Sequence, residues 1–276
     1  MRLVQDIKKV SVSLDLMGEK HTLGALAYKD GCCYFSYDAS FLEKKFDISP
    51  LLMPKQAGLQ MPTGGGIDGL FGVFNDSLPD GWGRLLVDRK IRQQNQNPAF
   101  LTPLDRLVYV GSSGMGALTY APEYDWGNCN ELIDLDSISH YAQAFFDEND
   151  GLYLDQLLSL NGSSSGVRPK IMMTMNGEEW LVKFPSYSDP VDIGPIEYAY
   201  HLMAKEAGLK LPEAKLMPSK TSFPYFSVKR FDRTPLGRLH MHTISGLLHA
   251  DHRFPSLDYS TILSVTQSLT QNKLEL

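Results

Sequence analysis

A single lysine lies inside a short apolar run, residues 180–185 (WLVKFP). The dipeptide Asn176-Gly177 precedes this run, and Asn-Gly between two β-prone segments is the strongest short-range hairpin signal. We therefore predict that Lys170–Met175 and Glu179–Phe184 pair as antiparallel strands, with Lys183 near the end of the second. A lone strand lysine is more often at a sheet edge, where it points to water, so the neighbouring segments must decide its role.

Those neighbours form a recognisable set. A loop of small residues precedes the hairpin (162–170, GSSSGVRPK), and Glu197 opens an amphipathic segment, 196–207, which Gly208 ends as a helix C-cap. Glycine and serine permit tight turns with accessible backbone N–H groups, and a helix carboxylate can fix a strand ammonium. Alone, such a loop is more often an ordinary connector. Together, loop, strand lysine and helix glutamate are typical of a kinase-like lobe that holds the phosphates of ATP.

The first half of the chain predicts a small antiparallel β unit followed by helices. Alternating apolar residues predict strands at Val10–Leu16, Thr22–Tyr28 and Cys32–Tyr37. Helices are predicted near 82–94, with Asp80 as N-cap, and at Pro103–Val110. Further strands are expected at Leu118–Tyr120 and Phe226–Phe231, and further helices near 137–148, 152–160, 242–249 and 258–269. The polar, acidic stretch 122–130 predicts a boundary, which gives an α+β protein with domains at residues 1–125 and 126–276.

Composition excludes several classes of protein. The 276 residues contain no apolar run long enough to span a membrane and no N-terminal apolar segment typical of secretion. Cys32, Cys33 and Cys129 show no metal-binding spacing, so we expect reduced thiols in a cytoplasmic protein and no zinc. A net charge of −6 offers no general attraction to nucleic acid, and no helix-turn-helix pair is evident. The basic cluster at 84–92 is more often a solvated helix face.

Several segments resemble the HipA family, the serine/threonine-protein kinase toxins of type II toxin–antitoxin systems. They are 162–170 (GSSSGVRPK), 180–185 (WLVKFP), the helix that opens with Glu197 and closes with 204–213 (AKEAGLKLPE), and 228–233 (VKRFDR). Phe35–Asp38 and 74–82 (FNDSLPDGW) are similar to the family's N-terminal subdomain. The resemblance covers nearly the whole chain, and it implies a HipA N-terminal-like unit followed by a kinase-like N-lobe.

The resemblance also implies roles for individual residues. Lys183 would contact the ATP phosphates, while Lys170 and the preceding loop would cover them. Ser163 aligns with the loop serine that is autophosphorylated in the family. The strand Ser227–Arg230 would pass the adenine edge. The implied nucleotide-binding set is Ser163, Ser164, Ser165, Gly166, Lys170, Lys183, Glu197 and Lys229.

The family continues into a catalytic loop with an Asp base and an Asn, followed by an Asp that binds Mg²⁺. We find no such set after His242, and Asp251 matches a segment upstream of the catalytic loop, so we assign no catalytic residue and no metal ligand. We therefore expect a chain truncated before the catalytic loop, with most of the kinase C-lobe missing. ATP binding should be weak or absent and phosphoryl transfer absent, since Mg²⁺ supplies much of the charge neutralisation.

Two other functions stay open. The chain could act without catalysis as a DNA-binding transcriptional regulator, or as part of a toxin–antitoxin complex in which a DNA-binding antitoxin is its partner and its own DNA contact is indirect or weak. It could also be a folded remnant without activity. Apolar residues at 247–248 and 262–263 predict an exposed apolar surface that another protein or a second copy of the chain would cover, so a homodimer is possible.

Overall fold

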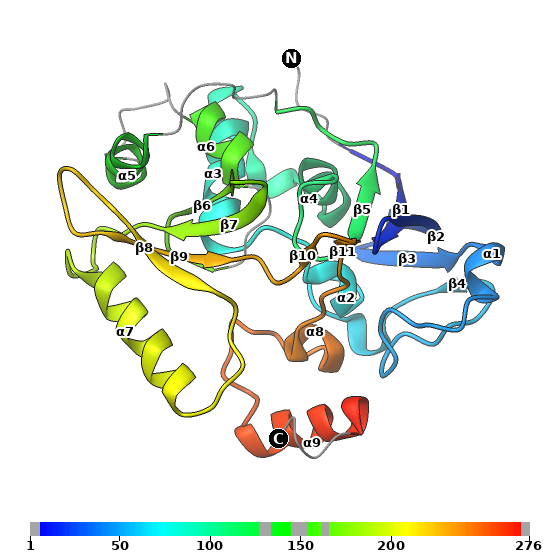
Figure 1. Cartoon of the computed structure of the whole chain (residues 1–276). Helices are drawn as coiled ribbons and strands as arrows, with labels where there is room; N and C mark the ends of the chain where they lie inside the picture. Colours follow the sequence, from blue (N-terminus) through cyan, green and yellow to red (C-terminus); the bar gives the residue numbers. More distant parts are fainter. Residues whose placement is uncertain (1–5, 127–133, 145–153, 162–165, 272–276) are drawn as a thin grey trace.

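The computed structural model describes residues 6–126, 134–144, 154–161 and 166–271 (Figure 1). Within them the chain forms a mixed α+β fold whose main strands lie in two antiparallel sheets. The predicted α+β class is confirmed at this level. The loop serines Ser163, Ser164 and Ser165 lie outside the described residues.

The first sheet has the strand order β4-β3-β2-β1-β5. Its strands are β1 (Lys9–Leu16), β2 (Glu19–Lys29), β3 (Cys32–Tyr37), β4 (Leu59–Gln60) and β5 (Leu118–Ala121). Side chains alternate between the two faces of a strand, and β1 buries Val10, Val12 and Leu14 accordingly. The predicted strands at 10–16, 22–28 and 32–37 are therefore confirmed.

Helices follow this sheet in the N-terminal half. They are α1 (Ala39–Leu42), η1 (Thr63–Gly65), α2 (Gly72–Asn75), α3 (Gly81–Gln93), η2 (Pro98–Phe100) and α4 (Pro103–Val110). A capping box explains the start of α4: Thr102 Oγ1 accepts from Asp105 N at 3.2 Å, and Asp105 accepts from Thr102 N at 2.8 Å. Asp80 occupies the N-cap position of α3 as predicted, but its side chain makes no capping hydrogen bond.

The second sheet has the order β6-β7-β9-β8. Its strands are β6 (Lys170–Met175), β7 (Glu178–Lys183), β8 (Ala214–Met217) and β9 (Tyr225–Lys229), accompanied by α5 (Leu135–Ala144), α6 (Leu154–Asn161) and α7 (Ile193–Glu206). The Asn176-Gly177 hairpin is confirmed. The sequence did not reveal β8, because its four residues are all half-buried and show no alternation.

The remaining elements are β10 (Arg233–Thr234), β11 (Gly237–Arg238), α8 (Ile244–Leu248) and α9 (Tyr259–Thr270). Figure 1 shows α8 beside α2, and the two backbones nearly touch: a Cβ on Gly72 would lie 1.9 Å from Gly246 O. Leu247 is buried in this contact, so the expectation that it forms exposed apolar surface is wrong; Leu263 on α9 is exposed.

A buried carboxylate joins the two halves. Asp232, fully buried, accepts hydrogen bonds from Arg230 (3.0 and 2.8 Å), from Arg233 Nη1 (2.7 Å) and from Gly116 N (2.8 Å). Arg233 also donates to Gly114 O at 2.8 Å and Gly116 O at 2.9 Å. The motif 228–233 therefore ties the second sheet to the glycine turn that precedes β5.

Burial alone would raise the pKa of Asp232, but the hydrogen bonds and charge of Arg230, the Gly116 N–H and the charge of Arg233 hold it below its ordinary value. A carboxyl whose pKa is lowered by folding contributes stability above its ordinary pKa of 3.8, and that stability is lost as the pH falls through the folded-state value.

The substitution Asp232→Asn should lower the free energy of unfolding at pH 7 by about 3 kcal/mol, because it leaves buried guanidinium charge without its carboxylate. Urea unfolding should also show a smaller acid-induced loss of stability below pH 4 in the variant than in the parent protein. An unchanged unfolding midpoint at pH 7 would contradict the role given to this carboxylate.

Candidate functional site: a lysine pair beside a glycine loop

Lys183, at the end of β7, forms an ion pair with Glu197 on α7. The two side chains are each about a third exposed, and the Lys183 ammonium lies 5.4 Å from the centre of the Phe226 ring. The hairpin fixes the strand position of Lys183, and α7 packs against β8 and β9 so that Glu197 reaches it. The carboxylate thus holds the ammonium in place while the charge still meets solvent.

Lys170 lies directly opposite Lys183 in the β6–β7 ladder, so both side chains project from the same face of the sheet. The Lys170 side chain is buried, and this desolvation lowers its pKa to about 8; Asp80 and Glu197 oppose the shift, whereas Lys183 and Arg168 add to it. Two ammonium groups on one face of a sheet are suited to holding an anion with more than one charge.

The described end of the glycine loop rests against α3. Gly166 N donates to Asp80 Oδ1, and Trp82 N donates to Gly166 O at 3.1 Å. The contact is close, since a Cβ on Gly81 would lie 2.7 Å from Val167 Cα. Both backbone groups of Gly166 are therefore held by the first turn of a helix from the other half of the chain.

Arg168, which follows the glycine loop, forms a bidentate ion pair with Asp189 that the sequence did not indicate. Its Nε and Nη2 each lie 2.9 Å from an Asp189 oxygen, and Asp189 also accepts from Ser186 N at 2.9 Å. The Arg168 hydrogen bond lowers the pKa of Asp189 to about 2. This pair anchors the loop to the segment between β7 and α7, and only its spatial proximity could have revealed it.

Lys229 does not join this group. It lies opposite Trp180, which is three positions from Lys183 along β7, so Lys229 projects from the other face of the sheet. There it pairs with Glu178. The adenine-edge role expected for Ser227–Arg230 needs backbone N–H groups that are free to bind adenine, and two of them already have partners. The backbone N–H groups of Lys229 and Arg230 donate to Glu213 O and Glu179 O, each at 2.8 Å, because β9 is an interior strand.

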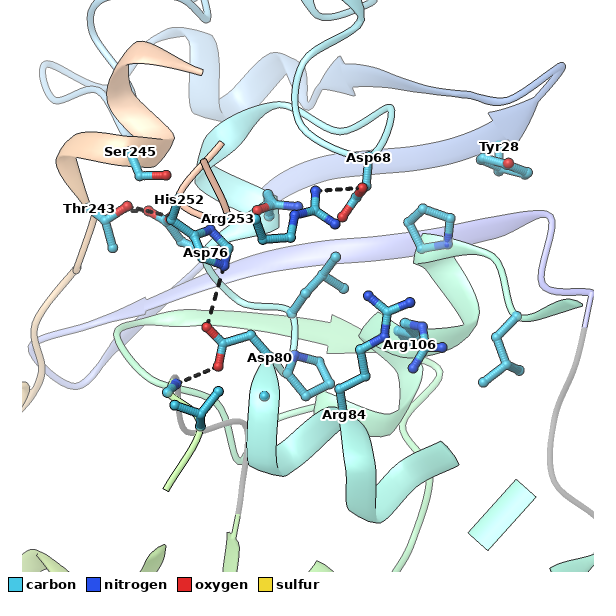
Figure 2. Close-up of a pocket in the computed structure, with 18 residues that line it drawn as sticks. Tyr28, Asp68, Asp76, Asp80, Arg84, Arg106, Thr243, Ser245, His252 and Arg253 are labelled. Carbon is cyan, nitrogen blue, oxygen red and sulfur yellow. Dashed lines mark hydrogen bonds and ion pairs between the residues drawn. The ribbon is translucent and has the colours of Figure 1, made fainter. Parts of the chain in front are cut away.

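A cavity of about 950 Å³ opens next to the loop (Figure 2). Its lining comes from β2, from the end of α2 and the start of α3, from the segment at the start of α4, from the end of the glycine loop and from the region around α8. The lining residues are Tyr28, Asp68, Asn75, Asp76, Leu78, Pro79, Asp80, Gly81, Arg84, Leu101, Pro103, Arg106, Gly166, Val167, Thr243, Ser245, His252 and Arg253. Lys170, Lys183 and Glu197 are not part of its lining, so the cavity meets the lysine site only at the loop.

The acidic side chains of this cavity already have partners. Asp68 pairs with Arg253 at 2.8 Å, and Asp76 accepts from Thr243 N and Thr243 Oγ1 at 2.7 Å each. Figure 2 shows Asp80 reaching toward His252, whose Nε2 lies 3.6 Å from it. Its other oxygen faces the loop. Arg84 points into the same space, and its nearest carboxylate is Asp88, at 3.9 Å.

The histidines between 240 and 252 have packing partners. His242 bridges Asp76 at 2.7 Å and Ser49 at 3.0 Å, while His240 contacts Ile48 O at 2.8 Å. Asp251 is held by Arg253 at 2.8 Å. Among the residues that the structure describes, no group of three or more His, Cys, Asp or Glu side chains is placed to hold a metal ion.

The described fold and site define an α+β protein in which a strand lysine, a helix glutamate and a glycine loop meet beside a second, N-terminal sheet. Residues 14–121 match the family described as the HipA N-terminal domain, and residues 162–276 match the HipA-like C-terminal domain. The chain therefore belongs to the HipA family, whose members are related to toxin–antitoxin kinases. Among curated proteins, no match was found. In the described parts of the chain, no helix has the length and apolar character needed to cross a membrane.

The buried Lys170 generates a prediction about pH. Because folding lowers its pKa to about 8, the folded state holds fewer protons than the unfolded state between pH 8 and 10, and the stability of the protein should rise with pH across that range. In Lys170→Met this component should be missing. Urea unfolding at pH 7.5 and pH 9.5 tests it, and an equal pH response in both proteins would contradict the burial of this ammonium.

Proposed function

We propose that the face of the second sheet carrying Lys170 and Lys183 binds the phosphates of a nucleotide, with ATP as the expected ligand. The observation that carries this proposal is the Lys183–Glu197 ion pair, which positions a strand ammonium through a helix carboxylate. Protein kinases use such a pair to hold the phosphates of ATP. Membership of the HipA family supports the same chemistry.

The neighbouring groups are consistent with a phosphate site. Lys170 adds a second ammonium on the same face, and the loop that ends at Gly166 supplies backbone near it. The Glu197 carboxylate keeps the Lys183 ammonium oriented. Binding of a ligand therefore costs little further side-chain entropy at Lys183. The proposal concerns binding. In the family, phosphoryl transfer further requires an Asp base and Mg²⁺ ligands.

The substitution Lys183→Met should abolish ATP-dependent thermal stabilisation, because it removes the fixed charge. It should change the stability of the unliganded protein little, by at most about 1 kcal/mol, since the pair is partly exposed. The measurement is the melting temperature with increasing ATP, where binding stabilises as RT ln(1 + [ATP]/Kd).

Lys229→Met is the matched control, since Lys229 is a paired strand lysine on the opposite face, and this variant should keep the ATP response of the parent protein. Loss of the response in Lys229→Met but not in Lys183→Met would overturn the assignment of the binding face. The absence of any shift at millimolar ATP in the parent protein would overturn the function itself.

We propose as a second candidate that the chain works in a protein complex, in line with the toxin–antitoxin character of its family. One observation favours it: Ile196, Tyr200 and Met203 recur at helical spacing on α7, and all three are exposed. The opposite side of α7 faces β8 and β9, so this apolar stripe has no cover among the described residues. A DNA-binding antitoxin or a second copy of the chain could occupy it.

The double substitution Tyr200→Glu/Met203→Glu should shift the protein from self-association toward monomer, because it places two charges in the apolar stripe. Light scattering coupled to size-exclusion chromatography measures the mass. Leu59→Glu, at an exposed apolar residue on β4, serves as the control and should leave the mass unchanged. A monodisperse monomer of the parent protein across the micromolar range would exclude the homodimer.

A further inference from the structure

Asp80 behaves unlike an ordinary helix N-cap. It stands at the N-cap of the 13-residue helix α3, where an aspartate normally accepts from the second or third helical N–H. Its side chain makes no such bond, and it accepts instead from Gly166 N in the other half of the chain. Asp80 therefore gives up a favourable local contact for one with the glycine loop.

The Asp80 carboxylate is surrounded by groups that bind anions: an ammonium, a backbone N–H and an imidazole. A Cβ built on Gly166 would lie 2.7 Å from Lys170 Nζ, so the ammonium sits against the same glycine whose N–H Asp80 accepts. His252 Nε2 lies 3.6 Å from the other carboxylate oxygen. Burial lowers the pKa of Lys170, and the nearby charge of Asp80 opposes this shift.

These contacts are held rigidly. Trp82 N donates to Gly166 O, so the carbonyl and the N–H of one glycine are both fixed by residues 80–82. A side chain on Gly81 would clash with the backbone of the loop segment, since its Cβ would lie 2.7 Å from Val167 Cα. The Asp80 carboxylate is therefore delivered to one position beside the loop.

We infer that the Asp80 carboxylate lies where a ligand phosphate would bind beside Gly166 and Lys170, and that it competes with the phosphates of a ligand for the Gly166 N–H and the Lys170 ammonium. The inference rests on the proposed phosphate-binding function of the loop and lysine pair. It assigns to the N-terminal unit a second task, which is to set how tightly the second sheet binds polyphosphate. Binding of a ligand would require Asp80 to withdraw toward His252 and the adjoining cavity, which it also lines.

Asp80→Asn separates charge from shape, since its side-chain oxygen can still accept from Gly166 N. We expect this variant to bind inorganic tripolyphosphate and ATP, both without Mg²⁺, about fivefold more tightly than the parent protein, as removal of one partly exposed competing charge allows. Isothermal titration calorimetry measures both affinities. Glu19→Gln, which removes an exposed charge from the first residue of β2, should bind as the parent protein does.

The outcomes are distinct. Equal or weaker tripolyphosphate binding by Asp80→Asn, when the parent protein binds it, overturns the inference and leaves phosphate binding intact. Tighter tripolyphosphate binding with no ATP binding supports the inference and overturns the nucleotide assignment. No binding of either probe by either protein overturns both. Asp80→Ser provides a second neutral variant if Asp80→Asn fails to fold, because serine caps a helix well, and it should show the same tightening.

Discussion

The Asp232 carboxylate holds the two halves of the chain in one arrangement. A fully buried charge is tolerated only when it is paired and hydrogen-bonded, and Asp232 meets this condition through Arg230, Arg233 and the Gly116 N–H. The same guanidinium groups donate to the carbonyls of the glycine turn at 114–116. The hydrogen bonds of Gly166 with Asp80 and Trp82 are further contacts between the two halves of the chain.

The strand register of the second sheet decides which lysines share a face. Lys170 and Lys183 share one face with α7, whereas Lys229 projects from the other. On the first face the charges gather around an ion pair, a buried ammonium and the end of a glycine loop. A polyanion is the ligand that best offsets such a concentration of positive charge. The N-terminal unit contributes the opposing charge, Asp80, from the start of α3.

Local patterns predicted the local structure well. The strands Lys170–Met175 and Cys32–Tyr37 and the helix Pro103–Val110 match the predicted bounds, because alternation, an Asn-Gly turn and a Pro at the first helical position are short-range signals. The order of loop, Lys183 and Glu197 left open whether these two residues, 14 positions apart, form an ion pair, and the structure shows that they do. Contacts between segments far apart in the chain have no comparable short-range signal in the sequence. The Gly166–Asp80 hydrogen bond spans 86 positions, and the Arg230–Asp232 motif revealed nothing of its role in joining the sheets. Lys229 was included in the site on the family resemblance, and a resemblance in sequence does not specify which face of a sheet a side chain occupies.

Amide hydrogen exchange measured by mass spectrometry with ATP, tripolyphosphate and adenosine would test the central claim most directly, because it locates where a phosphate binds. The account predicts that ATP and tripolyphosphate slow exchange in peptides covering residues 166–184 and the first turn of α3, whereas adenosine alone has a much smaller effect there. Unchanged exchange in these peptides under saturating ATP, or slowing confined to the cavity-lining segment at residues 101–106, would contradict it.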